Sequence, residues 1–122
     1  EGSNWEAAMA AVHVSLSSLT AIIDYNKIQQ SGDISTMLSL EPIAEKWKSF
    51  GWEVREIDGH NMDELVTTLD SLPFVDHKPS IIIAHTIKGK GASFAEGTHL
   101  WHNNVVDDHV FSKALEELEL SR

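Results

Sequence analysis

The segment Ser80-Ile-Ile-Ile-Ala-His85 most narrows the folds open to this chain, because its four successive apolar residues leave a strand without a polar face. A strand that is apolar on both sides needs cover on both sides, as in a parallel sheet between layers of helices. Residues 19–24 have the same character, and residues 52–57 alternate between apolar and polar side chains as a third strand. These patterns predict an α/β fold.

Helical patterns separate the predicted strands. Apolar residues recur at helical spacing in four segments, which begin near Asn4, Glu41, Asn61 and Asp107. Ser3 is placed as the N-cap of the first helix, with Glu6 at the reciprocal position of a capping box. Asn61 is placed to cap the third helix, and residues 25–32 are predicted to form a loop. The alternation predicts right-handed crossovers and helices on both faces of one parallel sheet.

The start of the pattern is unusual for an α/β unit, which normally begins with a strand. Here a capped helix begins at about residue 3, and only three strands follow. Such a sheet has an open edge and uncovered apolar surface, which native domains avoid. We therefore expect residues 1–122 to form one domain that is incomplete at its N-terminal side and docks against a further segment.

Composition excludes several classes of partner. The 19 acidic and 9 basic residues give a formal charge of -10, which opposes binding to nucleic acid and to anionic membranes. A small anionic ligand stays possible, because a metal ion or a helix N-terminus can hold phosphate locally. The chain has no cysteine, no apolar run of about 20 residues and no signal-like opening, which together favour a cytoplasmic protein outside the membrane.

Candidate ligands follow the predicted strands, since open α/β sheets bind ligands beyond the carboxyl ends of their strands. After the first strand, the Asn26 side-chain oxygen and the Ile28 carbonyl are oxygen ligands of the kind that Mg²⁺ or Ca²⁺ takes. Asp24-Tyr25-Asn26 is equally typical of a polar turn at a strand end. The pattern alone leaves both interpretations open.

The loop after the strand at Ser80–His85 carries two lysines and two histidines. The segment Lys88-Gly-Lys-Gly91 lacks the arrangement of a Walker phosphate loop, so by itself it predicts a flexible turn with solvated lysines. His99 and His102 form an H-x-x-H pair without further ligands nearby, and such pairs are usually solvated rather than metal-binding.

Short segments spread over nearly the whole chain resemble the transketolase family. They are Glu1-Gly2-Ser3, Ile23-Asp24-Tyr25-Asn26, Phe50-Gly51-Trp52, Asp58-Gly59-His60 and Thr86-Ile87-Lys88-Gly89-Lys90-Gly91. A Gly-Asp-Gly triplet followed by a distant Asn is shared by most thiamine diphosphate enzymes, whereas the Phe50 and Asp58 segments resemble transketolases in particular. In the family the triplet would lie just ahead of Glu1, so these 122 residues hold only part of the signature.

The resemblance implies a thiamine-diphosphate-binding fold, with thiamine diphosphate and Mg²⁺ (or Ca²⁺) as cofactors. It makes Asn26 and the Ile28 carbonyl ligands of the metal and its cofactor, and Ile87 a contact of a cofactor ring. Without the family, Ile87 is equally well explained as a strand-end residue that fills the core. His102 matches the catalytic histidine, which contacts the diphosphate and assists proton transfer, a role suited to a side chain that titrates near neutral pH.

The resemblance also implies a reaction and its partners. Glu1 and Glu6 match acids that in the family lie near a dimer interface and form a proton network. The reaction is reversible transfer of a two-carbon ketol unit from a ketose phosphate to an aldose. Two further parts would complete the site in a dimer or heterotetramer, namely the upstream Gly-Asp-Gly segment and a pyrimidine-binding domain or subunit. We therefore expect the isolated chain to be inactive, and slightly favour the N-terminal subunit of a split enzyme.

Two alternatives remain at this point. Another thiamine diphosphate enzyme, such as a deoxyxylulose phosphate synthase, shares the metal signature. A non-catalytic domain that binds a partner through its exposed sheet edge is a second possibility. The sugar donor and acceptor do not follow from these residues.

Overall fold

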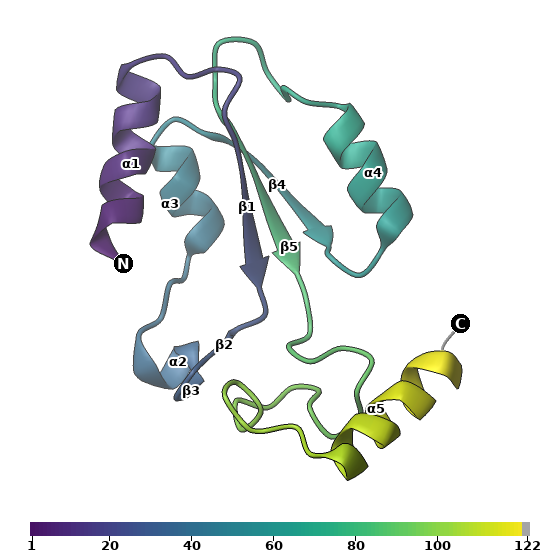
Figure 1. The fold of residues 1–122 in the computed structure, drawn as a ribbon. Coiled ribbons are helices and arrows are strands. Elements are labelled where there is room, and N and C mark those ends of the chain that lie inside the picture. Colours follow the sequence, from purple (N-terminus) through teal and green to yellow (C-terminus); the bar gives the residue numbers. More distant parts are fainter. Residues whose placement is uncertain (121–122) are drawn as a thin grey trace. The chain divides into compact units, whose positions relative to one another are not determined.

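A computed structural model describes residues 1–120 of the chain (Figure 1). The chain divides into two compact units. Unit 1 comprises Glu1–Tyr25 and Glu41–Thr86, and unit 2 comprises Asn26–Leu40 and Ile87–Arg122.

Unit 1 is built on a parallel sheet of the three predicted strands. These are β1 (Thr20–Tyr25), β4 (Glu53–Asp58) and β5 (Ser80–His85), in the order β1-β5-β4. The central strand is β5, and its Ile81, Ile82 and Ile83 are completely buried. The strand without a polar face therefore occupies the one position that has neighbours on both edges, as its composition predicted.

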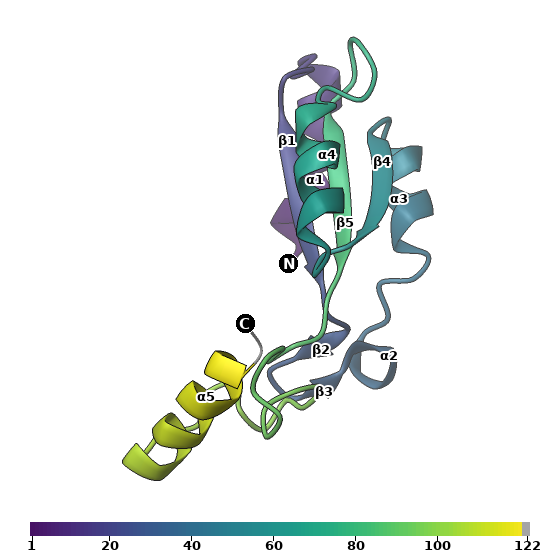
Figure 2. The same ribbon diagram turned by 90° about the vertical axis from the view of Figure 1, so that its right-hand side faces the viewer.

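Helices cover both faces of this sheet. Figures 1 and 2 show α1 (Gly2–His13) and α3 (Ile43–Ser49) on one face and α4 (Met62–Asp70) on the other. On the α1 and α3 face, the Trp47 and Trp52 rings pack edge to face with their centroids 5.0 Å apart. The Trp52 indole nitrogen donates a hydrogen bond to the Ala8 carbonyl at 2.9 Å. The predicted α/β class, with a parallel sheet and helices packed on it, is confirmed.

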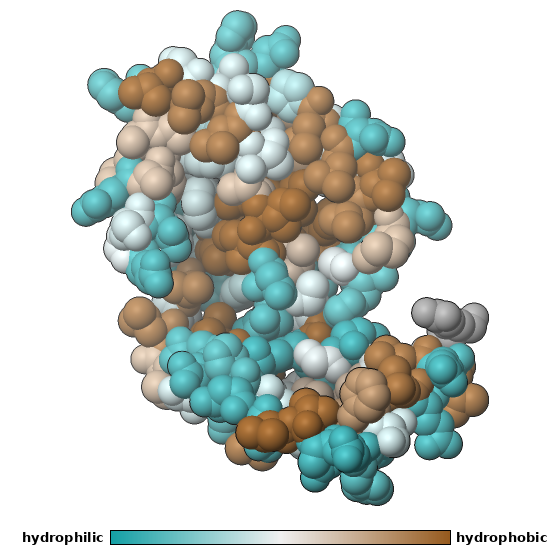
Figure 3. All heavy atoms as spheres, in the orientation of Figure 1, coloured by the Kyte–Doolittle hydropathy of each residue, from teal (hydrophilic) through white to brown (hydrophobic). Residues whose placement is uncertain are grey.

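The cover on the α4 face is incomplete. Leu65 and Phe74 pack against a core cluster of Ile57, Ile82 and Ala84, which lies on β4 and β5. On β1, Ile22 is 55% exposed, so the expectation that residues 19–24 are buried on both faces is wrong for this strand. Figure 3 shows apolar side chains gathered at the surface around β1 and α4. The cause is that α4 packs on β4 rather than on β1, which leaves this face of β1 largely uncovered.

The helix starts agree only in part with the predicted caps. Glu1 is the N-cap of α1 and no side chain in the described part of the chain bonds to that end, so the Ser3 and Glu6 capping box is wrong. Ser3 lies inside the first turn, because the helix begins at Gly2, two residues before the predicted start at Asn4. Asn61 does cap α4, since its side-chain oxygen accepts from the Glu64 amide at 3.1 Å. Within residues 1–120, no helix is long and apolar enough to cross a membrane.

Unit 2 contains the segment that was predicted as a loop and the last predicted helix. The loop in fact forms a small hairpin of β2 (Ile28–Gln29) and β3 (Gly32–Asp33), followed by α2 (Ile34–Met37). The helix α5 (Asp108–Leu120) starts where predicted, and the Asp107 side chain accepts from the Val110 amide at 2.8 Å. The apolar face of α5 stays largely exposed in the described residues, with Phe111 at 54%.

Candidate cofactor site

The carboxyl ends of the three strands meet at one edge of the sheet in unit 1. Tyr25 and Asp58 are both in register with His85, the last residue of β5. The Tyr25 and His85 rings touch edge to face, with their centroids 5.5 Å apart. The Thr86 hydroxyl donates a hydrogen bond to the Asp24 carboxylate. The ends of β1 and β5 are therefore joined through side chains as well as through the backbone.

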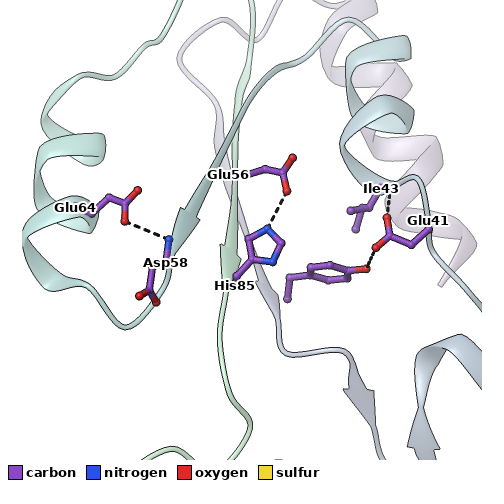
Figure 4. A network of polar contacts seen from close by, with 7 residues as sticks. Glu41, Ile43, Glu56, Asp58, Glu64 and His85 are labelled. Carbon is purple, nitrogen blue, oxygen red and sulfur yellow. Dashed lines mark hydrogen bonds and ion pairs between the residues drawn. The ribbon is translucent and has the colours of Figure 1, made fainter.

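A polar network extends from this edge (Figure 4). The Tyr25 hydroxyl donates to Oε1 of Glu41 at 2.5 Å, and the other oxygen of Glu41 accepts from the Ile43 amide at 3.1 Å. His85 Nε2 lies 2.8 Å from Oε2 of Glu56. Sequence analysis missed this network, because its members are separated by 16 and 29 residues and form no motif.

Gly59 allows the turn after β4 to lie against the end of β5. Its amide donates to the His85 carbonyl at 2.9 Å. A Cβ atom at this position would stand 2.5 Å from Cγ2 of Thr86 and 3.0 Å from Cβ of Ala84. A side chain does not fit without movement, which gives the Asp58-Gly59-His60 segment a structural reason for its glycine.

Asn26 and Ile28 lie together in one tight turn of unit 2. The Asn26 side-chain oxygen accepts from the Ile28 amide at 2.9 Å. Between them Lys27 has a φ of 63°, a left-handed conformation that is uncommon for residues other than glycine and is often found at functional sites. An amide oxygen has two lone pairs, so holding the turn does not by itself prevent Asn26 from binding a cation. The donor chemistry of this turn fits a hard metal ion.

His102 contacts a lysine of the glycine-rich loop in unit 2. Lys88 Nζ lies 3.2 Å from Nδ1 of His102. An ammonium group only donates hydrogen bonds, so where Lys88 donates to Nδ1, the ring donates through Nε2. Ile87 is 44% exposed, so it lies at the surface of the chain and does not fill the core.

The glycine-rich loop itself is held in place by internal bonds. Gly97 donates its amide to the Lys88 carbonyl at 2.9 Å, and Lys90 pairs with Glu96 at 3.6 Å. Gly89 has a φ of 74°, and a Cβ there would stand 2.4 Å from the Ala95 carbonyl oxygen. Both lysines thus have partners in a closely folded loop, and the Lys90 side chain is 50% exposed, in keeping with a solvated lysine.

A second contact ties this loop to α5. The Ser93 hydroxyl and amide both donate to the Glu117 carboxylate, each at 2.6 Å. These bonds, first that of the Ser93 side chain and then that of its backbone, hold the pKa of Glu117 below its usual value. Nothing in the sequence pattern indicated this pair, since the two residues are 24 positions apart.

Glu1 and Glu6 lie at the start of α1 in unit 1, and both are exposed. The proton network expected of them therefore stays a prediction. Within the described residues, no group of three His, Cys, Asp or Glu side chains is placed to hold a metal ion. The Asn26 turn offers neutral oxygen donors instead.

Comparison with known proteins shows which family the chain resembles. Residues 1–119 match the family described as "Transketolase, thiamine diphosphate binding domain". The chain belongs to the transketolase family. The resemblance found in the sequence is thus confirmed across nearly its whole length.

Two curated transketolase relatives and one solved transketolase structure show how the chain compares. It is 46% identical to the 6-deoxy-6-sulfo-D-fructose transketolase subunit SqwG of Clostridium sp. (strain MSTE9), over 98% of this chain and 43% of the relative. It is 41% identical to an apulose-4-phosphate transketolase subunit of Phocaeicola vulgatus, over 97% of this chain and 42% of the relative. The crystal structure of Campylobacter jejuni transketolase superposes with a TM-score of 0.88 at 32% identity, covering 98% of this chain and 18% of that one. The chain thus spans under half the length of these relatives.

Proposed function

We propose that this chain is the thiamine-diphosphate-binding part of a split transketolase, acting as its N-terminal subunit. The observation that carries this is 46% identity, over 98% of the chain, to a protein named as a transketolase subunit. A second relative, at 41% identity, is also named as a subunit. The reaction is reversible transfer of a two-carbon ketol unit between sugars. Because the two relatives are named for a sulfonated and a phosphorylated sugar, the donor is a ketose with an anionic end group.

The residues that would hold the cofactor are those of the Asn26 turn and the loop after β5. The Asn26 side-chain oxygen and the Ile28 carbonyl would bind Mg²⁺ (or Ca²⁺), which usually takes a few protein oxygens together with phosphate oxygens. Ile87 would pack against a ring of thiamine diphosphate. When bound, thiamine diphosphate supplies the carbanion chemistry that cleaves and forms the carbon–carbon bond.

His102 and Lys88 would act on the anionic groups of the bound molecules. With its proton on Nε2, His102 presents a hydrogen-bond donor to a phosphate or to an oxygen that gains negative charge. Lys88 holds the ring by its other nitrogen and adds a positive charge at 3.2 Å from it. In this arrangement His102 holds or donates a proton at Nε2 while Lys88 fixes its orientation.

The partner is a second polypeptide that carries the pyrimidine-binding domain, in a dimer or heterotetramer. The acidic metal ligand, from a Gly-Asp-Gly segment, would also come from residues outside these 122. Both donors in the Asn26 turn are neutral, so this chain alone should bind Mg²⁺ and the cofactor weakly. Exposed Glu1 and Glu6 would lie toward the subunit interface.

The test is a two-carbon transfer assay with the polypeptide that carries this sequence and its partner subunit, supplied with thiamine diphosphate, Mg²⁺ and a ketose phosphate. We expect transfer that needs both subunits and both cofactors. Asn26→Ala should lower transfer at limiting cofactor by at least about tenfold, since one of the two metal ligands that these 122 residues contribute is lost. Asn104→Ala, which removes an amide from an exposed loop residue of the same unit, is the matched control. Full activity without cofactor, or equal activity of Asn26→Ala, would contradict the proposal.

A further inference from the structure

The two segments proposed to bind the cofactor each follow a strand end directly. Asn26 comes immediately after Tyr25, the last residue of β1. Ile87 comes two residues after His85, the last residue of β5. Both segments are therefore joined to the sheet at these two strand ends.

On the face of the sheet that carries α1 and α3, Tyr25 is anchored to the start of α3. Tyr25 is 5% exposed, and its hydroxyl reaches Oε1 of Glu41 at 2.5 Å. The other Glu41 oxygen accepts from the amide of Ile43, the first residue of α3, at 3.1 Å. A hydrogen bond to an ionised carboxylate is stronger than one between neutral groups. Glu41 thus connects the end of β1 to a helix by two such bonds.

The neighbouring strand end is held by the same tyrosine. The Tyr25 ring packs edge to face on His85, which in turn reaches Glu56 of β4 at 2.8 Å. Successive side chains of a strand point to opposite faces, so Asp24 lies on the other face, where it accepts from the Thr86 hydroxyl. The ends of β1 and β5 are consequently tied on both faces of the sheet.

We propose that Tyr25 and Glu41 are positioning residues for the cofactor site, an inference that rests on the proposed function. They do not touch the cofactor. The Glu41–Tyr25 bond holds the last residue of β1, to which the Asn26 turn is directly joined. Each neutral oxygen of that turn binds a metal ion only weakly by itself. The affinity of the turn for the metal therefore depends on its oxygens being held in place before the metal binds.

The experiment measures the affinity of Mg²⁺ and thiamine diphosphate for the assembled enzyme by calorimetry, together with the cofactor KM, kcat and Tm. Tyr25→Phe removes the hydroxyl and keeps the ring on His85. Glu41→Ala removes the acceptor, and Glu41→Gln is a milder second variant that keeps the side-chain volume. Ser49→Ala is the control, because it removes a hydroxyl that bonds within α3, to the Glu45 carbonyl at 2.7 Å.

We expect Tyr25→Phe to raise the Kd for the cofactor with Mg²⁺ about tenfold, which corresponds to about 1.4 kcal/mol. The cofactor KM should rise in parallel, while kcat at saturating cofactor stays within about twofold, because these residues do not contact the reacting atoms. The double variant with Tyr25→Phe and Glu41→Ala should bind the cofactor no more weakly than whichever single variant binds it more weakly. The reason is that both substitutions remove the same hydrogen bond. Ser49→Ala should match the wild type.

Two results would overturn the inference. If the Tyr25 and Glu41 variants have a lower Tm but a cofactor Kd within about twofold of the wild-type value, the bond is purely structural and the proposed function stands. If the effects of Tyr25→Phe and Glu41→Ala simply add, the two residues do not act through one bond. A wild-type enzyme that binds no cofactor would remove the proposed function and this inference with it.

Discussion

Replacing Gly59 by alanine tests how tightly the turn after β4 is packed on the end of β5. The new methyl group would stand 2.5 Å from Cγ2 of Thr86, 3.0 Å from Cβ of Ala84 and 3.3 Å from the His85 carbonyl oxygen. Thr86 is not free to rotate away, because its hydroxyl bonds to Asp24. We expect the free energy of unfolding to fall by about 2 kcal/mol, within the range measured for overpacked cores.

The structure provides a rescue for this substitution. Thr86→Ser removes the Cγ2 atom that makes the shortest contact and keeps the hydroxyl that bonds to Asp24. In the Gly59→Ala background it should restore about half of the lost stability, measured by urea unfolding of the polypeptide that carries this sequence. Gly2→Ala is the control, because among the described residues an added methyl there meets no atom within 4 Å apart from its chain neighbours and the adjacent helix backbone. A loss below about 0.5 kcal/mol for Gly59→Ala, or no recovery with Thr86→Ser, would refute the packing argument.

Two further predictions concern unit 2. Ser93→Ala should raise the pKa of Glu117 toward its usual value, observed by NMR titration of its carboxyl carbon, because the Ser93 hydroxyl is the largest cause of the lowered pKa. Because the pKa of Glu117 is lowered in the folded state, the Ser93–Glu117 contact stabilises the fold at pH values above the usual pKa, and this stabilisation is lost as the pH falls through the folded pKa. Ser93→Ala should therefore weaken the dependence of the free energy of unfolding on pH in the acidic range. An unshifted titration of Glu117 would contradict this. Lys88→Met should release His102 from the tautomer with its proton on Nε2, seen by nitrogen-15 NMR, whereas Lys88→Arg should retain it. An unchanged tautomer in Lys88→Met would show that the lysine does not set it.

The predicted elements that proved right were those whose signal is local. The strand at Ser80–His85 was predicted with its correct bounds, because a short run of β-branched apolar residues favours a buried strand. The Asn61 cap was also predicted, since the bond that forms it spans only three residues. The Ser3 cap failed for a related reason: several polar residues at a helix start offer similar caps, and small differences decide between them.

The hairpin of β2 and β3 and the Tyr25 network were not predicted. The hairpin strands have two residues each, too few for an alternation of apolar and polar side chains to be recognised. The Tyr25–Glu41 and His85–Glu56 contacts join residues from different elements, so no spacing along the chain indicates them. The family resemblance identified Asn26 and His102 as candidates, but it did not indicate what holds them.

The sequence by itself determined the α/β class and the transketolase family, because both depend on patterns that can be read along the chain. Periodicity sets which segments are strands or helices, and short motifs carry the family. The tertiary structure decided which strand ends are joined, why Gly59 must lack a side chain and which lysine contacts His102. These properties depend on distances between residues that are far apart in sequence, and only the folded chain sets such distances.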